Sequence, residues 1–189
     1  MAIRLERKTA ETAISAVLDP ENDKVRVVTP CGFLNHMLEL MAHNAGWGLD
    51  LEAVGDTAVD FHHLVEDTGI ILGRALLEWY PSASRTRYGW CAMPMDCSLV
   101  LAAVDLSGRG SSVFRGNFPS EKCGDFDMEL VPEFFRAFAR ESRSSIHIHI
   151  MEADNSHHVS EAIFKGMGRS LAQALAPGSV SPSTKGMWP

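Results

Sequence analysis

The chain carries one histidine-rich pattern twice, 95 residues apart. His62–Glu66 reads HHLVE and His157–Glu161 reads HHVSE, and six of the fifteen positions that begin at each motif are identical. Two copies at matched positions predict an internally duplicated chain. The first repeat is expected over residues 1–90 and the second over 91–176, followed by an irregular Gly/Ser/Pro-rich tail over 177–189.

Each half shows the same succession of strand and helix patterns. Residues 33–43 place apolar side chains at the i, i+3, i+4, i+7 spacing of an amphipathic helix. The expected strands are 3–7, 13–18, 25–28, 49–54, 98–105, 111–115 and 145–151. The expected helices are 33–43, 62–79, 132–142 and 157–175. This order predicts an α+β fold: two small units of one sheet and two helices, each resembling domain 2 of ribosomal protein S5, packed by pseudo-twofold symmetry.

The composition excludes several classes of protein. A hydrophobic content of 46% and 189 residues suit one globular domain, or two small ones with a shared core. Seventeen Lys and Arg against 24 Asp and Glu give a net charge of -7, which argues against nucleic-acid binding. No apolar run approaches the roughly 18 residues of a membrane span. Residues 1–7 contain charged side chains and do not form an apolar signal segment. We therefore expect a cytoplasmic protein with no membrane partner.

The repeated HHxxE pattern predicts metal ligands on helices. Residues three and four apart share a helix face, so His62 and His63 both lie within reach of Glu66. The neighbouring His62 and His63 project about 100° apart and cannot easily chelate one ion together, so they would serve two ions, or ions at two subunit contacts. A single HH pair is usually a packing accident, but two matched copies are not. His147 and His149 share one side of a strand, where polar packing is the simpler interpretation.

The repeat also pairs two further residues that stand upstream of the motifs. His36 precedes His62 by 26 residues, and Glu133 precedes His157 by 24. The duplication then yields eight candidate ligands, enough for two ions with open positions: His36, His62, His63, Glu66, Glu133, His157, His158 and Glu161. Imidazole and carboxylate donors suit Mn, Fe or Zn. The cysteines fit no zinc spacing and are expected to be reduced thiols: Cys31, Cys91, Cys97 and Cys123.

Ordered motifs along nearly the whole chain resemble the imidazoleglycerol-phosphate dehydratase family. They are 7–12 (RKTAET), 33–38 (FLNHML), 55–56 (GD), 62–67 (HHLVED), 94–96 (PMD), 105–109 (DLSGR), 155–165 (NSHHVSEAIFK) and 183–186 (STKG). The resemblance implies a dehydration of D-erythro-imidazole glycerol phosphate to imidazole acetol phosphate in histidine biosynthesis. It also implies two Mn(II) ions per active site, built at subunit contacts in a shell of 24 subunits. The metal positions of the family fall on the same eight residues.

The resemblance also implies roles in catalysis and substrate binding. Glu11 and Glu161 are the candidates for the proton-transferring carboxylate and Asp96 is a further one, with Glu11 also contacting substrate. The phosphate group would be held by five residues, three of them in the tail: Arg87, Arg109, Ser183, Thr184 and Lys185. Four residues depart from the family pattern around the site: Asn35, Leu40, Asn44 and Cys97.

Two other functions fit the duplicated histidine motifs. A hydrolase could use metal-activated water on the same scaffold, although it would not require Glu11 together with a phosphate-binding set. A metal-storage or purely structural shell protein would bind ions without turnover. Mn-dependent turnover of imidazole glycerol phosphate separates all three.

Overall fold

The computed structural model describes residues 2–79 and 85–178. In the first half it contains β1 (Ile3–Lys8), β2 (Thr12–Asp19), β3 (Val25–Val28), α1 (Gly32–Ala45), β4 (Gly48–Gly55) and α2 (His62–Trp79). In the second half it contains β5 (Tyr88–Met95), β6 (Ser98–Asp105), β7 (Ser111–Arg115), β8 (Lys122–Cys123), β9 (Phe126–Asp127), α3 (Leu130–Ser142), β10 (Ser145–Glu152) and α4 (Ser156–Leu175). The α+β class is confirmed.

The two four-stranded sheets have the same internal order. The first runs β1-β2-β4-β3 and the second β5-β6-β10-β7. In each sheet the first three strands pair antiparallel, and the last strand pairs parallel to its neighbour. Each half therefore places its hairpin, its central strand and its parallel edge strand in corresponding positions.

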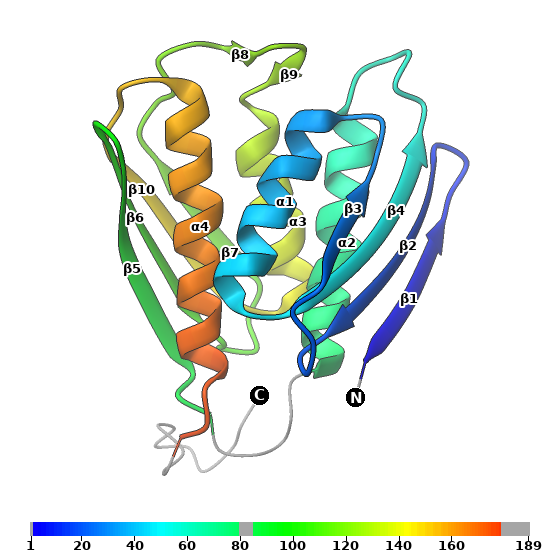
Figure 1. Cartoon of the computed structure of the whole chain (residues 1–189), viewed down its shortest axis with the longest axis horizontal. Coiled ribbons are helices and arrows are strands. Elements are labelled where there is room, and N and C mark those ends of the chain that lie inside the picture. The colour runs from blue at the N-terminus through cyan, green and yellow to red at the C-terminus, as the bar shows by residue number, and fades with distance from the viewer. Residues whose placement is uncertain (1, 80–84, 179–189) are drawn as a thin grey trace.

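The four helices lie between the two sheets (Figure 1). Within the first half α2 packs on β1 and β2, and within the second α4 packs on β5 and β6. The helices then pair across the halves, α1 with α4 and α2 with α3. Buried aromatic rings, among them Phe134, Phe138 and Phe164, fill this central helical layer. Because each half completes the core of the other, we expect neither to fold alone.

Close helix approaches occur at matched glycines. A Cβ on Gly73 of α2 would lie 2.6 Å from the Phe138 carbonyl oxygen of α3, and one on Gly168 of α4 would overlap the Met41 carbonyl oxygen of α1. Gly73 and Gly168 stand 95 residues apart, and Met41 and Phe138 stand 97 apart. A separation of 97 residues also relates His36 to Glu133, so the helix packing supports the pairing expected from the repeat.

Three observed strands are absent from the expected elements: the two-residue strands β8 and β9, and β5 of the second sheet. The sequence of β5 explains why it is hard to predict. Gly89 and Pro94 interrupt its pattern, and both residues weaken a strand assignment. Pro94 is tolerated because β5 is an edge strand, paired only to β6, and Gly89 is needed because α4 crosses directly above it. The strand spans the expected boundary at 90/91. No helix in the described part of the chain is both long and apolar enough to cross a membrane.

A buried ion pair ties the first hairpin to α2. Asp67, only 6% exposed, accepts a hydrogen bond from the Thr12 hydroxyl at 2.5 Å and lies 2.7 Å from the Arg7 guanidinium. We expect Asp67→Ala to lower the free energy of unfolding by about 3–5 kcal/mol, because it leaves a mostly buried guanidinium without its partner. Urea denaturation of metal-free protein measures this loss.

Arg26→Ala is the matched control. Arg26 pairs with Asp50 and Glu52 on the same sheet, but all three side chains are more than half exposed. Removing the Arg26 side chain should lower the free energy of unfolding by at most about 1 kcal/mol. Equal losses for the two variants would contradict the structural role assigned to Asp67.

Candidate metal centre

The eight candidate ligands gather at one end of the molecule. All four helices begin at the same end in Figure 1, and each ligand lies in the first two turns of its helix. The turns of the hairpins β1–β2 and β5–β6, which carry Glu11 and Asp96, reach the same end. We call this surface the ligand end. Residues that are widely separated in sequence are thus brought together by the common direction of the helices.

Three of the candidates converge within one chain. The Nε2 atoms of His36 and His157 each lie 3.1 Å from Oε1 of Glu161, and the nearest donor atoms of all three lie within 4.8 Å of one another. Two imidazoles and a carboxylate at this spacing suit a divalent ion such as Mn, Fe or Zn. The residues present therefore fit a metal.

The charge state of Glu161 is set by its neighbours. Burial alone would raise the pKa of this carboxyl, but hydrogen bonds from Lys165 at 2.5 Å and from His36 outweigh burial and lower the pKa to about 2. Glu161 is therefore ionised at neutral pH, which suits a ligand. A carboxylate with so low a pKa is a weak general base.

The corresponding residues on α2 and α3 do not converge in the same way. The Glu133 carboxylate pairs with Arg136 on its own helix, and Glu66 lies 3.5 Å from Arg140. Over residues 2–79 and 85–178, His36, His157 and Glu161 form the one group of three or more close ligand atoms. The two candidate half-sites thus differ within a single chain.

The histidines of each HH pair point to different surroundings, as their helical spacing predicts. The rings of His62 and His63 are 5.9 Å apart and nearly perpendicular, and those of His157 and His158 are 6.3 Å apart with the same angle. His157 faces Glu161, whereas His158 faces away from it. The expectation that the two rings of a pair serve different ions agrees with this geometry.

The second histidine of each pair meets two carboxylates in matching positions. His63 Nδ1 lies 3.0 Å from Asp56, and its Nε2 lies 3.7 Å from Glu11. His158 Nδ1 lies 3.5 Å from Asp154, and its Nε2 lies 3.5 Å from Asp96. The hydrogen bond to Asp56 raises the pKa of the His63 ring. Glu11 and Asp96 therefore occupy equivalent places, each in the turn of its hairpin.

The turn that carries Glu11 is held by local hydrogen bonds. The Thr9 hydroxyl accepts from the backbone N–H groups of Glu11 and Thr12. The Glu11 side chain is 52% exposed, and its Oε1 atom lies 3.7 Å from His63 Nε2 at the ligand end. Asp96 is 66% exposed, and its backbone has φ 48, a left-handed conformation that fits the tight turn.

The two expected phosphate-binding residues within the described chain, Arg87 and Arg109, lie at the opposite end. Arg87 immediately precedes β5 beside the C-terminal turn of α4, where its backbone N–H donates to the Ala174 carbonyl, and Arg109 follows β6. The 20 residues of α4 separate the two ends by about 30 Å. Arg87 bonds Asp105 and stacks on Tyr88, whereas Arg109 is exposed. The other three expected residues lie outside the described residues: Ser183, Thr184 and Lys185.

The four departures from the family pattern have individual structural roles. Asn35 accepts hydrogen bonds from the Thr29 N–H and hydroxyl and so orders the entry to α1. Asn44 donates to the Leu40 carbonyl within α1, and Leu40 packs partly buried against the core. Cys97 is exposed in the β5–β6 turn.

Sequence reasoning missed the residues that contact Nδ1 of the second histidines. Asp56, Asp154 and Asn155 stand in the loops that join β4 to α2 and β10 to α4. Acidic residues ahead of both histidine motifs were a usable signal, since metal-binding histidines commonly donate their other ring N–H to a carboxylate.

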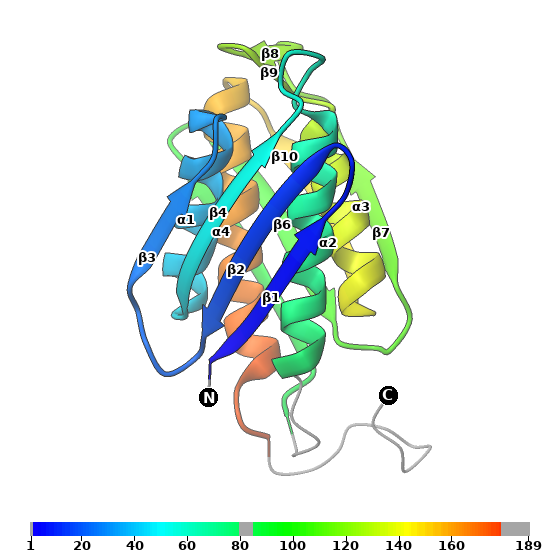
Figure 2. The same cartoon turned by 90° about the vertical axis from the view of Figure 1, so that its right-hand side faces the viewer.

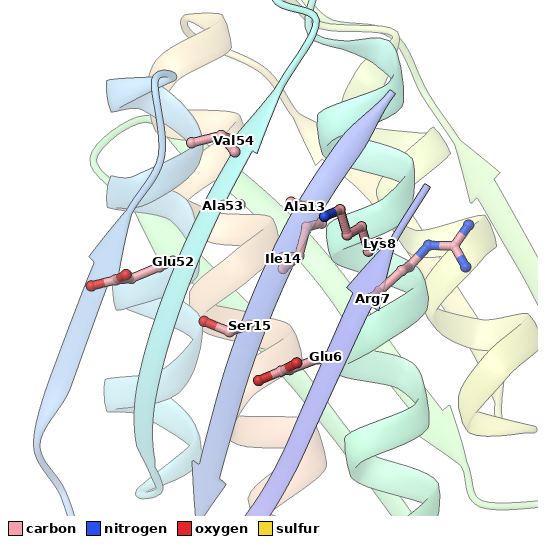
Figure 3. A pocket seen from close by; sticks show the side chains of 9 residues that line it. All are labelled: Glu6, Arg7, Lys8, Ala13, Ile14, Ser15, Glu52, Ala53 and Val54. Carbon is pink, nitrogen blue, oxygen red and sulfur yellow. The ribbon is translucent and has the colours of Figure 1, made fainter. Parts of the chain in front are cut away.

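A shallow hollow of about 280 Å³ lies away from the ligand end, on the outer face of the first sheet. Figure 3 shows Glu6, Ser15 and Glu52 on the neighbouring strands β1, β2 and β4, and the Lys8 side chain extending from β1 over β2. Figure 2 presents this sheet face-on. The hollow contains no histidine, and none of the eight candidate ligands lines it.

The chain matches known proteins along most of its length. The family model described as imidazoleglycerol-phosphate dehydratase matches residues 29–171. A relative of that name from Clostridium novyi is 46% identical over 171 residues, covering 89% of this chain and 87% of its own. One from Rhodopseudomonas palustris is 42% identical over 187 residues, covering 98% and 93%.

Two solved structures share the fold. The imidazoleglycerol-phosphate dehydratase of Staphylococcus aureus superposes with a TM-score of 0.86 at 38% identity, over 94% of this chain and all of that one. The IGPD of Pyrococcus furiosus superposes with a TM-score of 0.88 at 37% identity, over 97% of this chain and all of that one.

Proposed function

Because the chain belongs to the imidazoleglycerol-phosphate dehydratase family, and is thus a hydro-lyase of histidine biosynthesis, we propose that divalent ions and subunit contacts complete its active site. We propose two Mn(II) ions per site, held by the eight histidine and glutamate residues of the ligand end. The single observation that carries this proposal is the convergence of His36, His157 and Glu161, with matching motifs on α2 and α3.

The separation of the two ends supports an active site shared between chains. Arg87 and Arg109 lie about 30 Å from the ligand end of their own chain, farther than one small substrate can span. An active site that holds both the imidazole and the phosphate therefore needs the ligand end of one chain and the phosphate end of another. This requirement favours a homo-oligomer, and we propose the 24-subunit shell of the family.

Internal duplication fits the same assembly. The two sheets have equal strand orders, and the helix pairs α1–α4 and α2–α3 approach each other at glycines 95 residues apart. We propose repeats at 1–90 and 91–176, and a tail at 177–189 that contributes Ser183, Thr184 and Lys185 to the phosphate end.

Different residues of the chain carry the separate steps of the reaction. When bound, the metal ions orient the imidazole ring and diol and stabilise the negative charge that develops. Glu11 removes the C–H proton, because it is an exposed carboxylate at the ligand end that lies 3.7 Å from His63, whereas Glu161 is held by Lys165 at 2.5 Å. Asp96, in the equivalent turn, is the candidate for returning a proton. The hydroxyl on the carbon beside the ring gains a proton and leaves as water, and the resulting enol becomes the ketone when that carbon is protonated and the enol O–H loses its proton.

The phosphate end holds the other part of the substrate. Arg109 is exposed in the loop between β6 and β7, so its planar guanidinium can bond two phosphate oxygens. Arg87 is oriented by Asp105 through two hydrogen bonds. Fixing the phosphate at this end sets the position of the diol relative to Glu11.

Metal removal tests the proposal directly. We expect chelator-treated protein to lose turnover of imidazole glycerol phosphate and to fall to a smaller oligomer, because the ligands lie on four helices and cannot all converge within one chain. Adding Mn(II) should restore both properties together. Light scattering and an activity assay on the same samples measure this, and an unchanged mass after verified metal removal would contradict a metal-built assembly.

Glu133→His tests the one repeat-related ligand pair whose two members differ, a glutamate at 133 and a histidine at 36. Glu133 stands 97 residues after His36, and an imidazole there can replace the carboxylate as a ligand. We expect the variant to bind two metal ions and to remain active within about tenfold of the wild type, because imidazole and carboxylate are both suitable donors to these ions. Metal analysis of the purified oligomer measures the stoichiometry, and loss of one ion would remove Glu133 from the ligand set.

A further inference from the structure

The two equivalent histidines, His63 and His158, differ at Nδ1. His63 Nδ1 lies 3.0 and 3.2 Å from the two carboxylate oxygens of Asp56. An ionised carboxylate only accepts hydrogen bonds, so the proton of the neutral ring must be on Nδ1. The Nε2 atom of His63 then keeps its lone pair and faces the ligand end near Glu11, at 3.7 Å.

At His158 the amide of Asn155 fixes the opposite arrangement. The Asn155 carbonyl oxygen accepts from the His158 backbone N–H at 2.8 Å, which caps α4 and settles the orientation of the amide. Its Nδ2 therefore points to His158 Nδ1, at 2.7 Å, and to Asp154, at 3.1 Å. Because an amide nitrogen only donates, Nδ1 of His158 is the acceptor and the ring proton is on Nε2.

We infer that Asp56 is a positioning residue which presents Nε2 of His63 to a metal ion, and that Asn155 holds His158 in the opposite tautomer, so that the ion bound by His63 is taken up first. The inference rests on the proposed metal site. Before Nε2 of His158 can bind, its proton must leave and the hydrogen bond from Asn155 must break. In the neutral His63 ring, the Nε2 lone pair already faces the ligand end, and the hydrogen bond to Asp56 can stay in place when a metal ion binds.

The tautomers are measured on metal-free protein. Histidine-selective ¹⁵N labelling and long-range ¹H–¹⁵N correlation distinguish the protonated ring nitrogen, with each signal assigned by its loss in His63→Gln or His158→Gln. We expect Nδ1–H at His63 and Nε2–H at His158. The same tautomer at both rings would overturn the inference, and this outcome does not depend on whether the enzyme uses Mn(II).

Metal affinity is measured by titrating Mn(II) and following the free ion by electron paramagnetic resonance. The wild type should show two classes of site whose affinities differ by about 10-fold or more. Asp56→Ala should weaken the tighter class by about 10–100-fold, and Asp56→Asn, which keeps an acceptor oxygen, should lose less. Asp154→Ala is the matched control and should leave the tighter class unchanged.

A gain of affinity gives a second, independent test. Asn155→Asp keeps a good helix cap and places an acceptor opposite His158 Nδ1, as Asp56 does for His63. We expect the Mn(II) affinity of the weaker class of site to rise until it equals that of the tighter class. The inference would be overturned if Asn155→Asp left both Mn(II) affinities unchanged, or if Asp56→Ala left the affinity of the tighter class unchanged.

Turnover separates positioning from catalysis. Asp56→Ala should need more Mn(II) for half-maximal activity but reach a kcat close to wild type at saturating Mn(II). A low kcat at saturation would mean that Asp56 acts on the reaction itself and would overturn its positioning role. A wild type that turns over fully without metal would instead overturn the proposed function and leave the tautomer result standing.

Discussion

Replacing Glu11 by glutamine should lower kcat for imidazole glycerol phosphate by about 100-fold or more while metal content and oligomer mass stay unchanged. Glutamine keeps the shape of the side chain and its hydrogen-bonding capacity but cannot accept the proton. Glu11 is 52% exposed in a turn, so its replacement should not disturb the core. Steady-state kinetics, metal analysis and light scattering on one preparation measure the three quantities.

Asp96→Asn is the matched control for Glu11→Gln. Asp96 occupies the equivalent turn and faces His158 as Glu11 faces His63. If Glu11 is the base, Asp96→Asn should lower kcat by a smaller factor than Glu11→Gln does. A larger loss in Asp96→Asn, or loss of metal in Glu11→Gln, would contradict the assignment.

Gly89→Ala should destabilise the protein by about 5 kcal/mol or more, which approaches the whole stability of a domain. Gly89 lies in β5 under α4, and even a methyl group would overlap the Ser170 carbonyl oxygen and come within 3.0 Å of the Ala174 nitrogen. These are backbone atoms of a helix, so neither can move aside without displacing α4. Soluble yield and urea denaturation measure the effect.

Gly32→Ala is the control for that substitution. Gly32 is the first residue of α1, and a Cβ there would meet nothing within 4 Å. Alanine should be neutral or stabilise the protein by up to about 1 kcal/mol. If Gly89→Ala were equally stable, the packing of α4 on β5 would be wrong.

Much of the fold could be predicted because its elements follow regular periods. All four helices lie within two residues of their expected bounds, since each buries a continuous apolar stripe. The short strands β8 and β9 have no period to detect, and β5 carries the glycine and proline that usually argue against a strand. The pairing of α1 with α4 and α2 with α3 could not be predicted, because nothing in a helical period identifies the partner helix.

The candidate site could be predicted in its residue types but not in its geometry. The divergence of the two rings in each HH pair follows from helical spacing, and both pairs of rings are nearly perpendicular in the structure. The contact of Asp56 with His63, and the distance from Arg109 to the ligand end, arise from tertiary packing. The full set of eight ligands stays a prediction.

The central claim is that one active site combines the ligand end of one chain with the phosphate end of another, and mixing two inactive variants tests it. Glu11→Gln impairs only the ligand end and Arg109→Ala only the phosphate end. Equal amounts are dissociated with chelator, mixed and reassembled with Mn(II), and turnover is measured against each variant reassembled alone. A shared site predicts about a quarter of wild-type activity in the mixture, because random assembly of identical scaffolds pairs two intact ends in that fraction of sites. A mixture no more active than the separate variants would contradict the shared site.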